Sequence, residues 1–283
     1  MHLQCGIHTL DLSCPTPKVM GILNITPDSF SDGGRYYDGK QLSMDLVLQR
    51  AESMLAEGAT ILDVGGESTR PNAAPVSEQQ ELDRVIPVVE ALVQKLGALV
   101  SVDTSNAAVI QQSASSGASM INDVRALQGE GALAAAAKTG LPVCLMHMQG
   151  QPDTMQKAPS YTNVVIEVTD FLHRRMADCV TAGIARERIV LDPGFGFGKT
   201  LEHNLSLLAG LEKLSVLGQP VLVGLSRKSL LQQLLDRQVN DRLPGSLALA
   251  MAAAERGAAI IRVHDVAATV DVLRVFAAIS KYT

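Results

Sequence analysis

Two short runs of basic residues are the first features of the sequence that could do chemistry, because each could grip an anion. Arg262 and His264 are two positions apart in an apolar segment, and side chains at that spacing on a strand project to the same face. The run S-R-K-S at residues 226–229 precedes a helix-like stretch at residues 230–235, whose N-terminal N–H groups would attract negative charge. Taken alone, these patterns also fit a structural ion pair beside a buried histidine and an ordinary helix N-cap.

The segment D-P-G-F-G-F-G-K at residues 192–199 places a carboxylate and two aromatic rings on a glycine-rich loop. Glycine lets the backbone come close to a ligand, and the Asp192 carboxylate could accept hydrogen bonds from that ligand. The outer glycines are one residue too close together for the pattern G-x-x-x-x-G-K-[ST], so we do not expect a phosphate-binding P-loop. A tight turn in which Phe195 covers neighbouring side chains is the structural alternative.

Two long polar stretches, residues 24–34 and 65–71, are rich in Gly, Pro, Asp, Ser and Thr. That composition is typical of surface turns, but loops of this kind beside an active site can also close over a substrate. A further polar residue, His147, lies between two methionines. For His147 we favour a hydrogen-bonded structural role, because buried polar groups usually have partners.

All of these groups follow short apolar, β-branched runs that we predict to be strands. Between the runs lie longer stretches with apolar residues at three- and four-residue spacing, which predicts helices, and such alternation is typical of a parallel sheet. The predicted strands are residues 19–25, 60–64, 99–103, 119–124, 142–147, 189–192, 220–225 and 260–264. These strands, alternating with helices, predict an α/β fold of the closed (β/α)8 TIM-barrel type. We predict a single domain over residues 1–283, with residues 1–17 as an N-terminal extension or hairpin.

Polar residues at the ends of the predicted strands support this arrangement. At or near those ends stand Asn24, Asp63, Asp103, Asn122, His147, Asp192, Ser226 and Arg262. One such residue could be a structural cap, but a whole ring needs another reason, because a buried polar group without a partner costs free energy. In a barrel the carboxyl ends of all strands meet at one mouth, so we expect these side chains to face one ligand. The alternative, an open doubly wound sheet, is less well supported because no G-x-G-x-x-G follows the first strand.

Composition and charge restrict the function classes. The net charge of -5 argues against a nucleic-acid-binding protein, so a local cluster must hold any bound anion. The four cysteines show no C-x-x-C spacing, which indicates reduced and mostly buried thiols rather than a zinc or redox site. The sequence shows no signal peptide and no apolar run of membrane-spanning length. We therefore expect a cytoplasmic protein with no membrane or nucleic-acid partner.

Taken together, the motifs resemble those of the dihydropteroate synthase family. The resemblance rests on residues 24–34, 63–71, 102–104, 122–123, 192–199, 226–229 and 262–264, in this order over nearly the whole chain. The stretches N-x-T-P-D-S-F-S-D-G-G and D-P-G-F-G-F-G-K are the most specific. The resemblance implies a (β/α)8 barrel, a homodimer, and a transferase of folate biosynthesis that uses Mg2+. The expected reaction joins 6-hydroxymethyl-7,8-dihydropterin pyrophosphate to p-aminobenzoate and yields 7,8-dihydropteroate and pyrophosphate.

The resemblance also implies a role for each matching residue. The pterin would be bound by Asp103, Asn122, Met146, Asp192 and Lys228. The pyrophosphate would be bound by Asn24, Arg70, Arg262 and His264, with Asn24 also a ligand of Mg2+. The p-aminobenzoate would be bound by Thr69, Pro71, Phe197 and Ser229. The residues with catalytic roles would be Phe30, Asp32, Lys228, Arg262 and His264.

The mechanism that the resemblance implies is dissociative, so that pyrophosphate leaves first and the arylamine attacks the resulting pterin methylene cation. No activated nucleophilic side chain is then required, which fits a sequence without a recognisable Ser/His/Asp arrangement. Electrostatic stabilisation and exclusion of water become the main catalytic tasks. Because Phe30 and Pro71 are present, we expect sulfonamides to compete with p-aminobenzoate.

Two other functions are alternatives at this point. A pterin-dependent methyltransferase that serves a corrinoid protein would share the barrel and the pterin-binding carboxylates. It would have no need of the basic groups Arg70, Lys228, Arg262 and His264. A non-catalytic pterin-binding protein would also share the pterin site, but the intact loops at residues 24–34 and 65–71 favour an enzyme.

Overall fold

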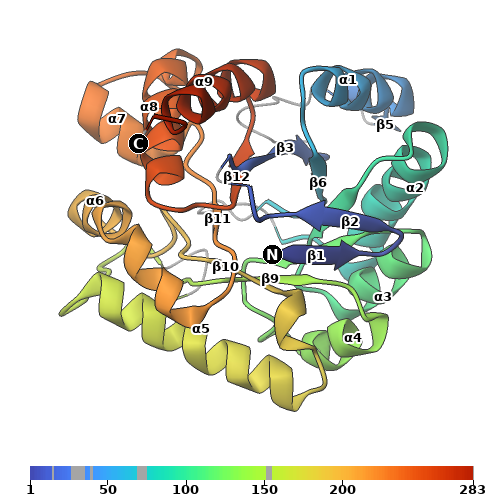
Figure 1. Cartoon of the computed structure of the whole chain (residues 1–283). Helices are drawn as coiled ribbons and strands as arrows, with labels where there is room; N and C mark the ends of the chain where they lie inside the picture. The colour runs from blue at the N-terminus through green and yellow to red at the C-terminus, as the bar shows by residue number, and fades with distance from the viewer. Residues whose placement is uncertain (15, 27–35, 39–40, 69–74, 151–154, 283) are drawn as a thin grey trace.

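The strands predicted from the sequence form one parallel sheet that curls into a barrel (Figure 1). The computed structural model describes residues 1–14, 16–26, 36–38, 41–68, 75–150 and 155–282. The barrel strands are β3 (Lys18–Asn24), β6 (Ile61–Gly65), β7 (Val100–Asp103), β8 (Met120–Asp123), β9 (Val143–Met146), β10 (Ile189–Asp192), β11 (Leu222–Val223) and β12 (Ile260–Val263). Within the described residues their order is β10-β9-β8-β7-β6-β3-β12-β11. A parallel bridge between Leu191 and Val221 joins the two edge strands, which confirms the predicted (β/α)8 barrel.

Every barrel strand begins and ends within two residues of its predicted bounds. Strands β6, β8, β9 and β10 are buried along their whole length, as expected for parallel strands with helices on one face and the barrel interior on the other. The shortest barrel strand is β11, where the sequence predicts residues 220–225. Pro220 has no backbone N–H for the ladder, although its carbonyl oxygen accepts a hydrogen bond from Leu191 N at 3.0 Å.

Helices surround the barrel on its outer side (Figure 1). They are α1 (Met44–Ala56), α2 (Glu78–Leu96), α3 (Ala107–Ser115), α4 (Ala132–Thr139), α5 (Val164–Thr181), α6 (Leu201–Ala209), α7 (Ser229–Leu235), α8 (Leu243–Glu255) and α9 (Val266–Ile279), with short 3-10 helices η1 (Arg186–Arg188), η2 (Leu211–Leu217) and η3 (Val239–Asp241). Apolar residues at helical spacing form their inner faces, as in α1, which buries Val47, Ala51 and Met54. Helix α2 begins with a capping box between Ser77 and Gln80, which satisfies backbone N–H groups at its start.

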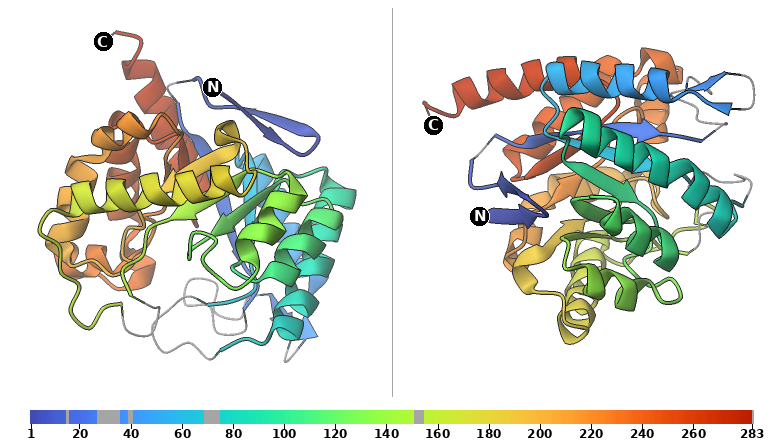
Figure 2. Two further views of the ribbon diagram at one scale, coloured as in Figure 1. Left: turned by 90° about the horizontal axis from the view of Figure 1, so that it is seen from below. Right: turned by 90° about the vertical axis from the view of Figure 1, so that its right-hand side faces the viewer.

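A hairpin near the N-terminus closes one end of the barrel. Its strands β1 (His2–Cys5) and β2 (His8–Asp11) are antiparallel, and Figure 2 shows the hairpin and the last turn of α9 at the same end of the molecule. Leu3, Cys5 and Leu10 of the hairpin are buried. They pack on the interior barrel residues Met20, Ile61, Leu99, Met120, Cys144, Val190, Leu222 and Ile260. A second, smaller antiparallel pair consists of β4 (Tyr37–Asp38) and β5 (Gln41–Leu42).

The barrel interior changes from apolar to polar along its axis. The layer next to the hairpin is made of the apolar residues just named. Two residues further along the strands, on the same interior face, stand Ile22, Asp63, Ser101, Asn122, Met146, Asp192, Gly224 and Arg262. Burial of so many polar groups needs mutual hydrogen bonds or a ligand, so the functional site is expected at the carboxyl ends of the strands.

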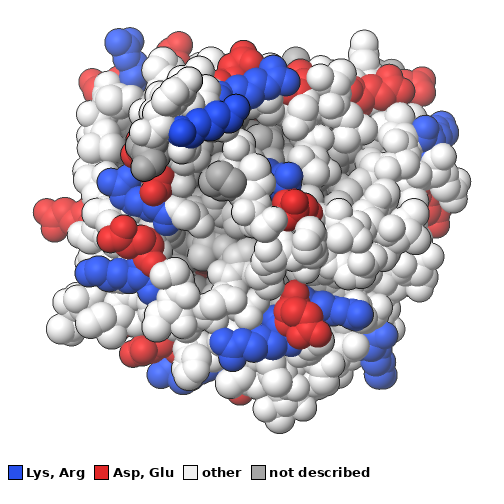
Figure 3. Space-filling view, viewed as in Figure 1, with Lys and Arg blue, Asp and Glu red and all other residues white. Residues whose placement is uncertain are grey.

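Charged side chains of both signs are interspersed on the face shown in Figure 3.

Three of the free cysteines, Cys5, Cys144 and Cys179, are buried, and Cys14 is exposed, in agreement with the prediction of mostly buried thiols. No helix in the described part of the chain has both the length and the apolar composition needed to cross a bilayer.

We expect the hairpin to contribute to the stability of the barrel through Leu3, which is 0% exposed. Leu3→Ala should lower the free energy of unfolding in urea by about 2–5 kcal/mol, because the cavity left behind cannot fully collapse. Ile7, at the hairpin turn and 93% exposed, provides the control: Ile7→Ala should change it by no more than about 0.5 kcal/mol. Equal effects of the two substitutions would show that the hairpin does not support the barrel.

Candidate active site

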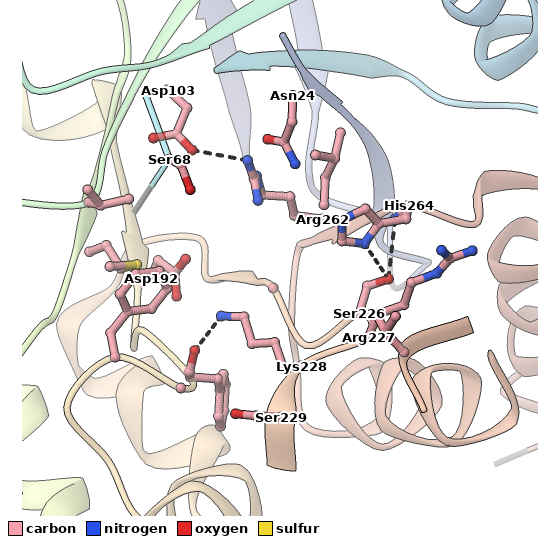
Figure 4. A pocket seen from close by; sticks show the side chains of 18 of the residues that line it. Asn24, Ser68, Asp103, Asp192, Ser226, Arg227, Lys228, Ser229, Arg262 and His264 are labelled. Carbon is pink, nitrogen blue, oxygen red and sulfur yellow. Dashed lines mark hydrogen bonds and ion pairs between the residues drawn. The ribbon is translucent and has the colours of Figure 1, made fainter. Parts of the chain in front are cut away.

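A cavity of about 640 Å³ opens at the carboxyl ends of the barrel strands. Figure 4 shows its polar side chains converging from different strands and from the start of α7. It brings together all the predicted site residues that lie in the described part of the chain, namely Asn24, Asp103, Asn122, Met146, Asp192, Phe197, Lys228, Ser229, Arg262 and His264. These residues span almost the entire sequence, so their convergence is a result of the barrel topology.

The remaining predicted site residues lie outside the described residues. They are Phe30 and Asp32 in the first long loop and Thr69, Arg70 and Pro71 in the second. Their predicted roles stay predictions.

An ion-pair network occupies the centre of the cavity wall. Arg262 donates from Nε to Asp63 Oδ2 at 2.6 Å and from Nη2 to Asp103 Oδ2 at 3.0 Å, while its Nη1 has no protein partner among the described residues. Burial works to lower the pKa of Arg262, but the charges of Asp63 and Asp103 outweigh it and hold the pKa above its usual range. The same burial raises the pKa of Asp103 to about 7, although Arg262 opposes this shift. Asn122 Nδ2 adds a hydrogen bond to Asp63 Oδ2 at 3.3 Å.

Asp192 lies at the end of β10, at the bottom of the glycine-rich loop. Its Oδ1 accepts a hydrogen bond from Gly194 N at 2.7 Å, and Asp192 as a whole is only 7% exposed. Burial raises its pKa, and the positive charge of Lys228 acts in the opposite direction. Gly194 has φ 69, and a Cβ there would lie 1.8 Å from the carbonyl oxygen of His147. Only glycine can therefore hold this turn against the end of β9.

Lys199 stabilises the glycine-rich loop by hydrogen bonds to its backbone carbonyl groups. The sequence patterns do not single it out as a site residue. It is 3% exposed, and its Nζ donates to Gly194 O at 2.8 Å and to Phe197 O at 3.1 Å and lies 2.9 Å from His147 Nδ1. Burial lowers the pKa of Lys199 to about 7, and burial together with Lys199 lowers the pKa of His147 to about 3. His147 thus has the structural role expected from the sequence. The structural role of Lys199 is revealed only by its tertiary contacts with His147 and with the glycine-rich loop.

All four residues of the S-R-K-S run at 226–229 line the cavity. Lys228 Nζ donates to the carbonyl oxygen of Phe195 and lies 4.6 Å from the centre of the Phe197 ring. Burial lowers the pKa of Lys228 to about 8, with Asp192 acting against this shift. Ser226 Oγ lies 3.0 Å from His264 Nδ1, which orients the imidazole. The predicted helix after the run is confirmed as α7, which begins at Ser229.

Several further residues line the cavity. Thr26 and Ser68 lie in the two long polar loops noted in the sequence, whereas Met155, Gln232, Gln238 and Arg242 have no local signal there. Asp63 lies at a predicted strand end, but no pattern indicates that it binds Arg262, which is 199 residues away in the chain. Such pairings follow from strand register, which the sequence alone does not give.

A buried acidic cluster borders the cavity beside Glu67. Arg125 donates to Glu67 from Nη1 at 3.2 Å. Glu81, in the first turn of α2, is 4% exposed, and its Oε1 has no hydrogen-bond partner in the described structure. Burial raises the pKa of Glu81 to about 6, a hydrogen bond with Thr104 opposes the shift, and the charge of Glu67 adds to it.

Glu81 should make the stability of the protein depend on pH. Its pKa is about 6 when folded, against an ordinary value of 4.5, so the folded state binds more protons than the unfolded state in this window, and stability falls as pH rises through it. Ionisation of Glu81 then lowers the free energy of unfolding by roughly 2 kcal/mol at pH 7. Glu81→Gln should raise the free energy of unfolding by that order at pH 7 and by clearly less at pH 5. Glu78→Gln, on an exposed position of the same helix, is the control, and a Glu81→Gln gain that is independent of pH would contradict the assignment.

Comparisons with known proteins give one consistent result. The family model described as "Pterin binding enzyme" matches residues 20–264. The dihydropteroate synthase of Haemophilus influenzae is 53% identical over 278 residues, 98% of both chains. That of Escherichia coli strain K12 is 57% identical over 267 residues, 94% of this chain and 92% of the relative. The crystal structure of Yersinia pestis dihydropteroate synthase with a sulfonamide drug is 56% identical, has a TM-score of 0.95, and is matched over 99% of this chain and 100% of that one.

The similarity covers the barrel, the strand ends and the loops from which the cavity is built. The chain is identical to each of the Haemophilus influenzae and Escherichia coli relatives at more than half of the aligned positions, over more than nine tenths of both chains. Such similarity shows a common family. The chain belongs to the dihydropteroate synthase family of pterin-binding enzymes.

Proposed function

We propose that this chain performs the dihydropteroate synthase reaction by a dissociative substitution, with a cavity that offers buried carboxylates to the pterin and basic groups to the pyrophosphate. As a member of its family, the chain is a transferase that joins 6-hydroxymethyl-7,8-dihydropterin pyrophosphate to p-aminobenzoate. The observation that carries the mechanism is the placement of Asp103 and Asp192 in the same cavity as Lys228, Arg262 and His264. The alternative of a corrinoid-dependent methyltransferase is not favoured, because the relatives are synthases.

The pterin would bind at the carboxylate side of the cavity. A pyrimidinone edge presents adjacent N–H donors, and an ionised carboxylate can accept both. Asp192 fits this role because its Oδ2 has no described protein partner, while Oδ1 is held by Gly194 N. Burial raises the pKa of Asp192, so donors supplied by the pterin would favour the charged form that burial disfavours. Asp103, Asn122 and Met146 would contact the rest of the ring.

The pyrophosphate would bind at the basic side, near Arg262 and His264. Arg262 is held in place by two carboxylates, and its Nη1 would be the group that donates to a phosphate oxygen. Each charged hydrogen bond of this kind contributes ~1.5–3 kcal/mol. Those that strengthen as negative charge builds on the leaving group lower the barrier. Arg70 would add a further positive charge.

Mg2+ would bind together with the pyrophosphate, at Asn24. Asn24 lines the cavity, and its amide oxygen is the kind of ligand that Mg2+ accepts. A single protein oxygen fits this metal, because Mg2+ usually keeps several waters and takes phosphate oxygens beside one or two protein groups. The ion would neutralise part of the charge on the leaving group.

The p-aminobenzoate would bind between Phe197 and Ser229, with Thr69 and Pro71 from the second loop. Phe197 offers a ring face for an aromatic substrate, and both Phe197 and Ser229 line the cavity. The Yersinia pestis relative was crystallised with a sulfonamide drug, which supports the expectation that sulfonamides compete for this part of the site.

In the proposed mechanism the bond between the pterin methylene carbon and the diphosphate oxygen breaks first, and its electron pair leaves with pyrophosphate. The amine nitrogen of p-aminobenzoate then forms the new C–N bond and loses one proton, giving dihydropteroate. The first loop would supply Asp32 to face the cation and Phe30 to exclude water. We further propose that the enzyme is a homodimer of the cytoplasm, in line with the family resemblance.

The full chain, supplied with Mg2+, the pterin pyrophosphate and p-aminobenzoate, should release pyrophosphate and form dihydropteroate in equal amounts. A sulfonamide should raise the apparent KM for p-aminobenzoate without lowering the maximal rate, because both compounds would occupy the same part of the cavity. A coupled assay measures the release of pyrophosphate, and chromatography measures the formation of dihydropteroate. Absence of turnover would overturn the synthase proposal, and an apparent KM for p-aminobenzoate that a saturating sulfonamide leaves unchanged would overturn the shared site.

Asp192→Asn should weaken binding of the pterin by roughly tenfold to a hundredfold, because one or two charged hydrogen bonds are lost. The KM for p-aminobenzoate should change far less. Calorimetry with the pterin substrate and steady-state kinetics measure the two effects. Asp271→Asn on α9, where the carboxylate is 75% exposed, controls for the loss of a charge, and equal pterin affinity in Asp192→Asn and the parent protein would refute the assigned role.

A further inference from the structure

Arg227 has a backbone conformation that is unusual for its residue type. Its φ of 57° lies in the left-handed region, which residues with a Cβ adopt only when their surroundings impose it. The residue stands between Ser226, which orients His264, and Lys228, which lines the cavity. The direction in which Lys228 leaves the backbone therefore depends on this strained position.

Three groups hold Arg227 in this conformation. On one side, its backbone N–H donates to Ser246 Oγ at 3.0 Å. On the other side, its carbonyl oxygen accepts a hydrogen bond from Arg242 Nη1 at 2.9 Å. Its own side chain donates from Nε to Asp265 Oδ2 at 2.8 Å. Both polar groups of the Arg227 backbone are thus fixed by residues of α8 or its N-cap.

Arg242 also connects Arg227 to the rest of the α7 segment. It is 7% exposed, and its Nε donates to Arg237 O at 3.0 Å, beyond the end of α7. Its Nη2 donates to the side chain of Gln232, within α7, at 2.9 Å. One guanidinium therefore binds the backbone two residues before α7, a side chain within α7, and the backbone two residues after it. The planar fork of an arginine presents five donors in a fixed geometry, which suits it to bind three acceptors at once.

We infer that Arg242, together with Ser246, is a positioning residue that places Lys228 and Ser229 for the reaction by locking the left-handed turn at Arg227. The inference rests on the proposed function, since its effect is read through binding of the pterin and of p-aminobenzoate. Arg242 itself lines the cavity, so the experiment must separate an action through Arg227 from direct contact with a substrate.

A double-mutant cycle makes this separation. Glycine adopts the left-handed region without strain, so a protein with Arg227→Gly has less need of Arg242. Arg242→Met in the parent protein should lower kcat/KM for the pterin substrate between about fivefold and 150-fold, the range that corresponds to backbone strain of this kind. In the Arg227→Gly background the same substitution should cause a clearly smaller loss. Arg274→Met on α9, where the side chain is 75% exposed, controls for the loss of an arginine.

Ser246→Ala provides a second test that removes much less of the structure. It takes away the acceptor for Arg227 N–H and a hydrogen bond from Ser246 Oγ to Arg242 O. It should give a smaller loss that is again reduced in the Arg227→Gly background. The melting temperature of each variant is measured beside its kinetics, and a loss of kcat/KM without a matching loss of folded protein supports positioning.

Two results would overturn the inference. Equal fold-losses from Arg242→Met in both backgrounds would mean that Arg242 does not act through Arg227. Parent-like kinetics of both Arg242→Met and Ser246→Ala would mean that the turn needs neither residue. The proposed function fails in a different way, because the parent protein would then release no pyrophosphate from its substrates.

Discussion

The ion pairs of Arg262 with Asp63 and Asp103 are the interaction on which the mouth of the barrel depends. The three charges come from β12, β6 and β7, so they join the last barrel strand of the chain to two strands from its first half. Removal of one partner from such a buried set leaves the others uncompensated, which is strongly destabilising. The network therefore connects β12 to β6 and β7 across β3, and it fixes the direction of the guanidinium that would meet a phosphate.

The loops around this network are held by buried basic residues that bind backbone carbonyl groups. Lys199 fastens the glycine-rich loop through Gly194 and Phe197, and Arg242 fastens the segment around α7 through Arg227 and Arg237. In both cases the contacts fix the backbone next to a side chain that lines the cavity. Catalysis by electrostatic stabilisation needs such preorganisation, because charged groups that must first reorient lose part of their effect.

Much of this arrangement is predictable from the sequence. Short apolar runs that end in a polar residue, such as the one ending at Asp192, predict both the barrel strands and the side chains that meet at the mouth, because parallel strands share one polar end. The roles of Lys199 and Arg242 are not predictable, since each depends on contacts with backbone groups of other segments. The short β11 is a similar case. Its extent depends on Pro220 and on pairing with strands distant in sequence.

The hairpin of β1 and β2 has a consequence for how the chain can be joined to other molecules. The hairpin and the last turn of α9 lie at one end of the barrel (Figure 2), and the cavity opens at the carboxyl ends of the strands, away from the hairpin. An affinity tag, a surface tether or a fused enzyme at either terminus would emerge on the side remote from substrate entry. Immobilised or fused forms of this protein should therefore leave the route of small molecules into the barrel open.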